Sequence, residues 1–148
     1  MRQRATSVRS ASSVSGAAMA ALCVRLARKL PEAAQGARAD RWRLLEQALG
    51  NLVDNAVRYN HTGGHVAVVL DAHGAGFTIT VTDDGPGVTE TALAQLTERW
   101  FRADDARTRR PDGQGLGLAI AAESLKRLGF TLKFSRPDEG GLTATIST

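Results

Sequence analysis

Three glycines alternate with other residues in the stretch GQGLG, namely Gly113, Gly115 and Gly117, directly before a helical pattern. Glycine destabilises a helix interior by about 1 kcal/mol relative to alanine, so the presence of three glycines at the start of a helix requires an explanation. A glycine-rich turn that runs into a helix leaves unpaired N–H groups at the positive end of the helix dipole, which together attract anions. The spacing matches neither a dinucleotide fingerprint nor a Walker loop. The stretch therefore indicates an anion site of another kind, or a flexible hinge without a ligand.

A second polar group lies in the segment NLVDNAVRY. Asn51, Asn55 and Arg58 fall within about 60° of one another on a predicted helix whose other face is aliphatic. Asparagine is a poor choice for a merely solvated helix face, because its helix propensity is low. An amide oxygen is a suitable ligand for Mg²⁺, which also binds phosphate oxygens. We therefore expect Asn55 to bind Mg²⁺ and Arg58 to contact phosphates.

A third candidate is the carboxylate of Asp83 in the segment DDGPG. The preceding strand alternates, and Asp83 has the same parity as its apolar positions Ile79 and Val81, so it is expected at the strand end beneath the helices. A carboxylate there is costly to bury without a partner. It either caps its own turn or accepts a hydrogen bond from a ligand, to which Gly85 and Gly87 would let the backbone come close. Taken alone, the motif is more typical of a plain Asp-Gly turn.

The helices and strands that carry these residues can be predicted from the periodicity of apolar residues. A helix is predicted to begin with Asp40 as N-cap and to end near Asn60, with an apolar stripe formed by Leu45, Ala48, Leu49, Leu52 and Ala56. Two hairpins are predicted, one from strands 65–70 and 77–82 and one from strands 131–135 and 142–147. A further helix is expected over 89–100, entered at Thr89, and another after the glycines.

The strands alternate between an apolar face and a face of Thr, Ser and Lys, so the sheet is covered on one side only. This predicts a two-layer α/β sandwich with a mixed, mostly antiparallel sheet and about three helices on its apolar face. The domain is expected to span residues 39–148. Residues 1–38 are interpreted as a linker and N-terminal edge segment, partly disordered, in which 17–38 fit either a short helix or an edge strand.

The amino-acid composition limits the kinds of partner and site that this chain is expected to have. The 148 residues carry 19 Lys and Arg against 15 Asp and Glu, and this net charge of +4 favours an anionic partner without saying which kind. The single cysteine, Cys23, excludes an internal disulfide framework and a Cys-based zinc site, and it fits a reducing, cytoplasmic setting. No apolar run approaches the ~20 residues of a membrane span. Membrane contact by this segment is therefore not expected.

Four motifs occur together in the order and spacing of a known family. NLVDNAVRY, DDGPG, ERWFR and GQGLGLAI match the N box, first glycine box, F box and second glycine box. From Asp40 to Thr148 the chain resembles the ATP-binding catalytic domain of two-component sensor histidine kinases. The wider superfamily, which includes DNA gyrase, mismatch-repair ATPases and heat-shock chaperones, has the Bergerat sandwich fold. That fold agrees with the one-sided sheet expected from the strands.

The resemblance implies roles for the residues of the N box. Asn55 would coordinate Mg²⁺, and Asn51 would line the same face near the phosphates of ATP. Arg58 would contact phosphate, and Tyr59 would lie along the nucleotide. The implied ligands are therefore ATP and Mg²⁺.

The resemblance also implies how the base and the lid are formed. Asp83 would accept from the adenine amino group, with Gly85 and Gly87 shaping the base pocket. Residues 103–112 would be the lid, and Arg102 would reach the phosphates as a stabiliser. The remaining nucleotide contacts would come from Gly113, Gly115, Leu116, Gly117 and Leu118.

One departure from the family pattern affects the lid. The F box usually opens with phenylalanine, and Thr97 stands at the equivalent position. Trp100 and Phe101 are the remaining aromatics. This substitution is expected to weaken the anchoring of the lid.

The phosphoacceptor segment of the family is absent. The three histidines, His61, His65 and His73, are interpreted as turn or strand residues without the acidic helical surroundings of a phosphoacceptor. We expect a catalytic half from a longer protein, which binds Mg·ATP and donates the γ-phosphoryl group to a histidine on a dimerisation domain of the same or a sister chain. A response regulator is the further implied partner, and a membrane anchor elsewhere in the whole protein is left open.

Two other functions are compatible with parts of the sequence. The nearer alternative is a serine-directed kinase of the anti-sigma type or another ATPase of the superfamily, against which the form of the lid and ERWFR argue. The more distant alternative is a basic module that binds nucleic acid. Aromatic residues make up only 5% of the chain and no stacking platform or recognition helix stands out, so nucleic acid is not an expected partner.

Overall fold

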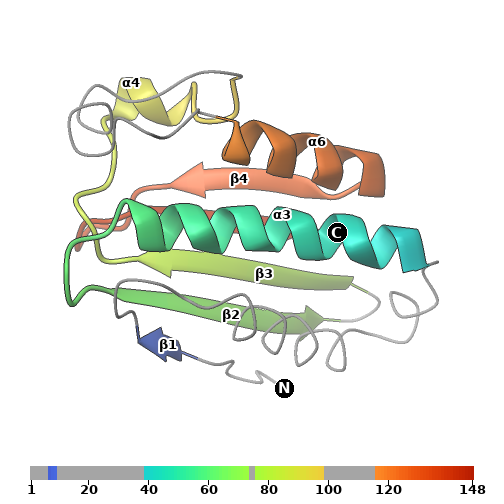
Figure 1. The fold of residues 1–148 in the computed structure, drawn as a ribbon, viewed down its shortest axis with the longest axis horizontal. Coiled ribbons are helices and arrows are strands. Elements are labelled where there is room, and N and C mark those ends of the chain that lie inside the picture. Colours follow the sequence, from blue (N-terminus) through green and yellow to red (C-terminus); the bar gives the residue numbers. More distant parts are fainter. Residues whose placement is uncertain (1–6, 10–38, 74–75, 99–115) are drawn as a thin grey trace.

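A single sheet with helices on one face makes up the described part of the molecule (Figure 1). The computed structural model describes residues 7–9, 39–73, 76–98 and 116–148. Its helices are α3 (Ala39–Arg58), α4 (Glu90–Leu93) and α6 (Gly117–Leu128). Its strands are β1 (Ser7–Arg9), β2 (His65–His73), β3 (Gly76–Asp83), β4 (Thr131–Ser135) and β5 (Thr143–Ser147).

The strands lie in the order β1-β2-β3-β5-β4. Strands β2 and β3 form a hairpin from Val66↔Asp83 to His73↔Gly76, and β4 and β5 form a second one. Both predicted hairpins are confirmed, although β2 continues to His73 because its last residues still pair with β3. All pairings among the described strands are antiparallel, so this part of the sheet is antiparallel rather than mixed.

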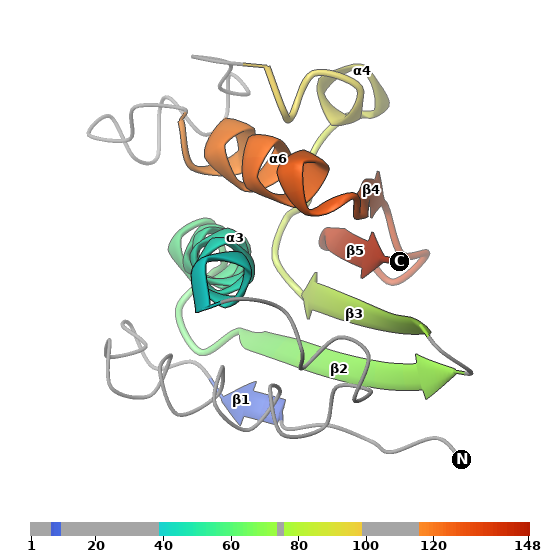
Figure 2. The same ribbon diagram turned by 90° about the vertical axis from the view of Figure 1, so that its right-hand side faces the viewer.

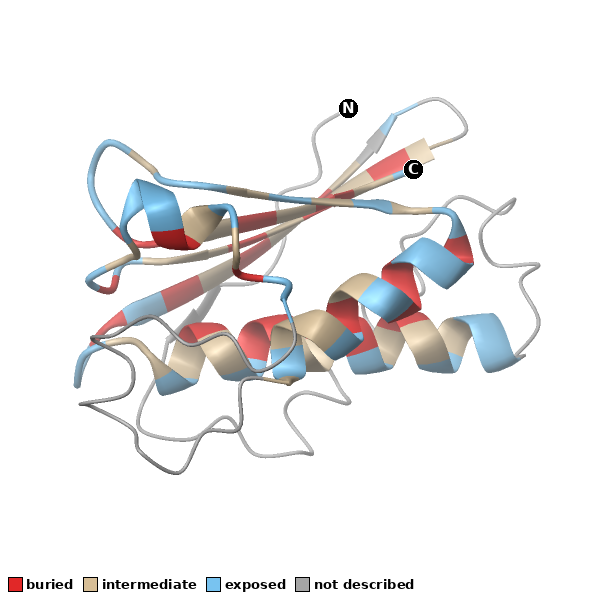
Figure 3. Cartoon of the chain, turned by 90° about the horizontal axis from the view of Figure 1, so that it is seen from above, coloured by how far each residue is buried: buried red, intermediate tan, exposed pale blue. Residues whose placement is uncertain are grey.

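Helices α3 and α6 lie side by side on one face of the sheet, as Figure 2 shows, and they run in opposite directions. The predicted apolar stripe of α3 is buried throughout. In β3 the side chains of Phe77, Ile79 and Val81 are buried and those of the intervening threonines are half-exposed. Figure 3 shows the buried positions along α3, α6 and the strands. The two-layer sandwich predicted from these alternations is confirmed.

Helix α4 is shorter than the sequence indicates. Thr89 is its N-cap as predicted, and the Thr89 hydroxyl accepts from the Ala92 N–H at 3.2 Å. After Leu93 the backbone bonds span three residues instead of four, as in Gln95 N–H to Ala92 O at 3.0 Å. The α-helix therefore ends after one turn, and residues 99 and 100 of the predicted helix lie outside the described residues.

The N-terminal segment contributes the edge strand β1, which pairs with β2 from Ser7↔Ala67 to Arg9↔His65. The rest of residues 1–38 lies outside the described part, and the domain boundary at residue 38 stays a prediction. None of the described helices combines the length and apolar character that a membrane crossing requires.

Candidate functional site

Two of the predicted polar groups lie at the same end of the fold. The C-terminal end of α3 and the C-terminal end of β3 both lie at the left of Figure 1. Helix α6 begins alongside the C-terminal half of α3, because the two helices pack antiparallel. Three features therefore border one region. They are the start of α6, the N-box face of α3 (Asn51, Asn55 and Arg58) and the turn after β3 (residues 83–87, called the Asp83 turn).

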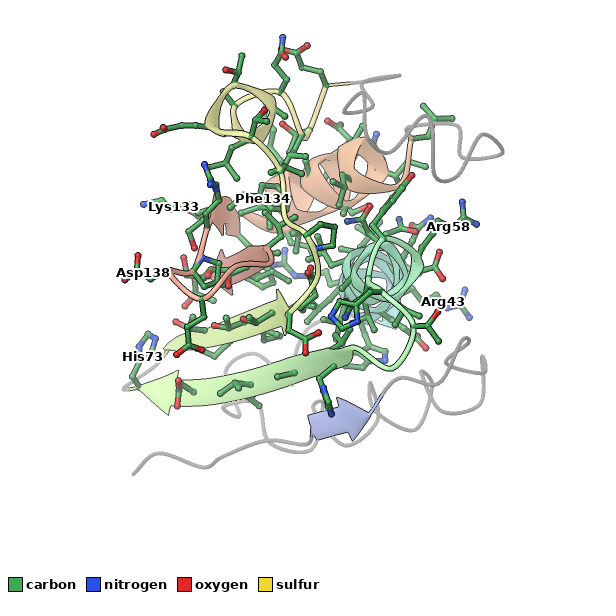
Figure 4. The ribbon with its side chains drawn as sticks, turned by 90° about the vertical axis from the view of Figure 1, so that its left-hand side faces the viewer. Arg43, Arg58, His73, Lys133, Phe134 and Asp138 are labelled. Atoms are coloured by element: carbon green, nitrogen blue, oxygen red, sulfur yellow. The ribbon has the colours of Figure 1, made fainter. Side chains whose placement is uncertain are left out.

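The predicted polar face of α3 is present, because the helix is continuous from Ala39 to Arg58. Asn51 and Asn55 are half-buried and Arg58 is exposed. Figure 4 shows Arg58 pointing away from the sheet. Tyr59 is half-buried directly after the helix, and its N–H donates to the Asn55 carbonyl oxygen at 3.1 Å. Two amides and a guanidinium thus lie on one side of the helix.

Asp83 is half-buried at the end of β3. Its Oδ1 accepts from the Gly85 N–H at 2.9 Å, and its own N–H donates to the Leu142 carbonyl oxygen at 3.0 Å. Burial raises the pKa of Asp83, and the backbone N–H groups of Gly85 and Leu142 oppose that rise. An ionised carboxylate has about four acceptor positions, so the cap of its own turn leaves room for a ligand. The two alternatives for Asp83 are therefore compatible.

Glycines allow the Asp83 turn to be packed from two sides. A Cβ on Gly85 would lie 3.0 Å from Asp83 Oδ1 and 3.1 Å from Asn60 Oδ1. A Cβ on Gly87 would lie 2.6 Å from the Gly141 carbonyl oxygen, and a Cβ on Gly141 would strike the Asp83 carbonyl oxygen. The turn is thus held against the end of α3 on one side and against the β4–β5 turn on the other.

The second aspartate of the motif, Asp84, is the centre of a hydrogen-bond network. Its Oδ1 accepts from the His65 N–H at 2.7 Å and from Asn60 Nδ2 at 2.9 Å, and its Oδ2 lies 3.2 Å from His65 Nδ1. The Asn60 amide, followed by the N–H of His65, lowers the pKa of Asp84 to about 2. Sequence reasoning missed this network, although the doubled aspartate in DDGPG and the asparagine directly after the N box, Asn60, are its visible signs.

Acid is expected to remove the contribution of Asp84 to stability. Its pKa is lower in the folded state, so the ionised group stabilises the fold above the unfolded pKa of 3.8, and this contribution is lost as the pH falls toward about 2. In thermal unfolding, Asp84→Asn should therefore lower the melting temperature at neutral pH, and the gap to the wild type should shrink as the pH falls below about 4. A gap that stays constant down to about pH 2 would contradict this.

Helix α6 begins without a side-chain capping bond from its own N-cap residue. Leu116 is the N-cap residue and makes no side-chain capping bond, and the first helical bond runs from the Ile120 N–H to the Leu116 carbonyl oxygen at 2.9 Å. Gly117 is exposed and Leu118 is half-buried, and a Cβ built on Gly117 would meet no described atom within 4 Å beyond its chain neighbours and its own helix backbone. Packing among the described residues therefore gives no reason for glycine at this position.

Several predicted site residues lie outside the described residues. They are Arg102, the lid segment 103–112, Gly113 and Gly115, as well as the F-box aromatics Trp100 and Phe101. Thr97 is described and exposed, whereas its neighbour Leu96 is buried. The roles of the undescribed residues stay predictions.

Comparison with known proteins decides the family. Residues 40–148 match the family model of the histidine kinase-, DNA gyrase B- and HSP90-like ATPases. The chain belongs to this ATPase family. Within the family, the sensor histidine kinase CpxA of Escherichia coli (strain K12) is 42% identical over 102 residues, which are 69% of this chain and 22% of CpxA. The ATPase domain thus spans about a fifth of the length of this relative.

Solved structures agree with the family. The mycobacterial sensor histidine kinase MprB has a TM-score of 0.65 and 31% identity to the ATPase domain, with 72% of each chain covered. Full-length ShkA in complex with AMPPNP has a TM-score of 0.59 and 28% identity, with 72% of this chain and 21% of ShkA covered. The chain is therefore a catalytic ATPase domain of the sensor-kinase kind with a Bergerat sandwich, as the four boxes predict.

The polar face of α3 offers the ATPase domain one type of metal ligand, the half-buried amides of Asn51 and Asn55. In the part of the chain that the structure describes, no group of three or more His, Cys, Asp or Glu could hold a metal ion. Mg²⁺ usually keeps several waters and binds through one or two protein ligands together with substrate phosphates. These residues therefore fit a Mg²⁺ ion that arrives with a nucleotide.

Proposed function

We propose that the domain binds Mg·ATP between the polar face of α3, the Asp83 turn and the start of α6. In the whole protein, it would donate the γ-phosphoryl group to a histidine on a helical dimerisation domain, for two-component signalling. The observation that carries this proposal is the common location of the Asp83 carboxylate and the N-box face at one end of the fold.

The adenine base is assigned to Asp83. Its carboxylate is half-buried, and its own turn uses one oxygen, Oδ1, through Gly85. The other oxygen would accept from the exocyclic amino group of the base. A charge-assisted hydrogen bond of this kind contributes about 1.5–3 kcal/mol, more than a bond between neutral groups. Gly85 and Gly87 would shape the base pocket, because they let the Asp83 turn pack closely against Asn60 and Gly141.

The phosphates are assigned to the polar face of α3 and the start of α6. Asn55 would bind Mg²⁺, while Asn51, Arg58 and Tyr59 would line the same side of α3. The N-cap residue of α6, Leu116, makes no side-chain capping bond, and the first turn of the helix contains no acidic residue, which would favour an anion there. Glycine at Gly117 has no packing role among the described residues, which supports close approach of a ligand there. Leu116 and Leu118 would flank that approach, and Arg102, Gly113 and Gly115 would complete it.

Catalysis by such a site consists of positioning and charge neutralisation, so no side chain of this domain needs to act as a covalent nucleophile. Bound Mg²⁺ would neutralise charge on the phosphates. The histidine that receives the phosphoryl group and the response regulator that takes it next would be supplied by partners. Because ATP is the substrate, the domain is expected to work in the cytoplasm. That ShkA was solved with AMPPNP supports a nucleotide at this site.

Titration with nucleotide tests this function. The isolated domain is expected to bind Mg·ATP with an affinity between micromolar and millimolar, followed by tryptophan fluorescence, because a small open site gains modest binding free energy. Asn55→Ala should weaken Mg·ATP by about tenfold and should reduce the difference between titrations with and without Mg²⁺. Turnover by the domain alone should be slight.

The control for this titration is Arg127→Ala, which removes only an exposed pair with Glu123 on α6 and should leave binding unchanged. Absence of ATP binding by the wild type would refute the proposed function. Clear ATP consumption by the domain alone, abolished by Asn55→Ala, would contradict the expectation that transfer needs the dimerisation domain.

A further inference from the structure

Asn60 connects three parts of the fold with a single side chain. It lies two residues after the end of α3. Its Nδ2 donates to the His65 carbonyl oxygen at 3.0 Å and to Asp84 Oδ1 at 2.9 Å. Its Oδ1 accepts from the His61 N–H at 2.8 Å. Both amide hydrogens are therefore used, and the orientation of the amide is fixed by its donors and its acceptor.

The backbone of the Asp83 turn is packed directly against Asn60. A Cβ on Gly85 would lie 3.3 Å from Asn60 Cα and 3.1 Å from its Oδ1, and Gly85 is buried. Gly85 is also the residue whose N–H caps Asp83 at 2.9 Å. The position of Asn60 thus sets the position of the residue that orients the Asp83 carboxylate.

The other end of this connection is the N-box helix. The N–H of Tyr59 donates to the Asn55 carbonyl oxygen at 3.1 Å, so a helical bond ties Tyr59, the residue before Asn60, to the last turn of α3. Asn60 and Asp84 are 24 residues apart in the chain, and between them lie β2 and β3. A side-chain bridge therefore joins the helix end directly to the strand end.

The anchor on the strand side, Asp84, has several hydrogen-bond partners. Asp84 is held by the His65 N–H at 2.7 Å, and Asp84 N–H donates to the His65 carbonyl oxygen at 3.3 Å. The same His65 carbonyl oxygen accepts from Asn60. His65 Nδ1 and His61 Nε2 lie 3.2 and 3.9 Å from the Asp84 carboxylate. An ionised carboxylate with several donors makes a stronger hydrogen bond to the Asn60 amide than a neutral acceptor would.

We propose that Asn60 is a positioning residue that fixes the distance between the adenine-binding carboxylate of Asp83 and the magnesium-binding amide of Asn55. This inference rests on the proposed function. A nucleotide that contacts both Asp83 and the Mg²⁺ ion on Asn55 needs these two residues at one fixed distance. A ligand that contacts Asp83 alone does not. Loss of Asn60 should therefore weaken long nucleotides selectively.

The test compares two ligands on the same variants. Affinities for Mg·ATP and for AMP, which lacks the β- and γ-phosphates, are measured for the wild type, Asn60→Asp and Asn60→Ala. Asn60→Asp keeps the size of the side chain but replaces the donor with an acceptor facing Asp84. Both variants should lose about tenfold in Mg·ATP affinity, as is usual for residues that orient ligands of a metal, and AMP affinity should stay within about twofold.

His73→Ala is the matched control. It removes a histidine–threonine hydrogen bond of 2.9 Å at the opposite end of the same β2–β3 hairpin, and both affinities should remain those of the wild type. An equal loss for Mg·ATP and AMP, or no loss for either ligand in a folded variant, would overturn the positioning role. If the wild type itself does not bind Mg·ATP, the proposed function fails first and this inference fails with it. Circular dichroism identifies the folded variants. If the added charge of Asn60→Asp unfolds the domain, the affinities of Asn60→Ala decide the test.

Discussion

Asp83→Asn is expected to weaken Mg·ATP by about two orders of magnitude while the domain stays folded. Asp83 Oδ1 accepts from the Gly85 N–H, and an ionised carboxylate has further acceptor positions for the adenine amino group. An asparagine has one oxygen and one NH₂ group, so either Gly85 or the base would meet a donor instead of an acceptor. Loss of a charged hydrogen bond, with a donor left unpaired, costs about 1.5–3 kcal/mol or more.

The same substitution should not lower stability. Burial raises the pKa of Asp83, so the folded state disfavours the ionised form. This penalty is absent below the unfolded pKa of 3.8 and is present once the pH lies above the folded pKa. Asparagine carries no charge to desolvate. At neutral pH the melting temperature of Asp83→Asn is therefore expected to equal or exceed that of the wild type.

Calorimetric titration with Mg·ATP checks the expected loss of affinity, and a thermal melt checks the expected melting temperature. Asp138→Asn removes the same charge from the exposed β4–β5 turn, where Figure 4 labels it, and serves as the control. It should bind Mg·ATP like the wild type. Retained affinity in Asp83→Asn would show that this carboxylate does not hold the base, and a large drop in its melting temperature would show that it stabilises the fold instead.

The elements and the parity of their residues could be predicted because these depend on local pattern. The stripe that includes Leu49 and Leu52 repeats at helical spacing, and Phe77, Ile79 and Val81 alternate over a strand long enough to be unambiguous. The position of Asp83 at the strand end is also confirmed, because β3 runs from Gly76 to Asp83. Both burial patterns follow from the geometry of one helix and one strand.

The contacts that hold the site together could not be predicted in this way. Asn60 and Asp84 meet only because β2 and β3 return the chain to the end of α3. Gly141 lies against Asp83 because β5 pairs with β3, and nothing in the local pattern of the β4–β5 turn indicates that partner. The early end of α4 depends on a choice between three- and four-residue hydrogen bonds, which periodicity does not resolve. Contacts between residues far apart in the chain are therefore the part of the structure that the sequence pattern does not predict.

The largest loss of stability is expected from Gly141→Ala. Gly141 is buried with a φ of 86°, and a Cβ there would strike the carbonyl oxygen of Asp83, which is backbone and has no rotamer to move away. The left-handed conformation alone costs alanine about 1–2 kcal/mol. With the clash added, we expect a loss of about 3 kcal/mol and a fall of roughly 10 °C in melting temperature.

Gly140→Ala separates the two causes of that loss. Gly140 has a φ of 94°, but the nearest atom to its Cβ would be the Gly85 carbonyl oxygen at 3.9 Å, which is ordinary contact. It should therefore lose only about 1 kcal/mol, from backbone conformation. Because the clash at Gly141 displaces Asp83, the folded fraction of Gly141→Ala should also bind Mg·ATP more weakly, whereas Gly140→Ala should bind normally. Equal melting temperatures and equal affinities for the two variants would mean that the β4–β5 turn does not hold Asp83 in place, since backbone conformation would then account for the whole effect.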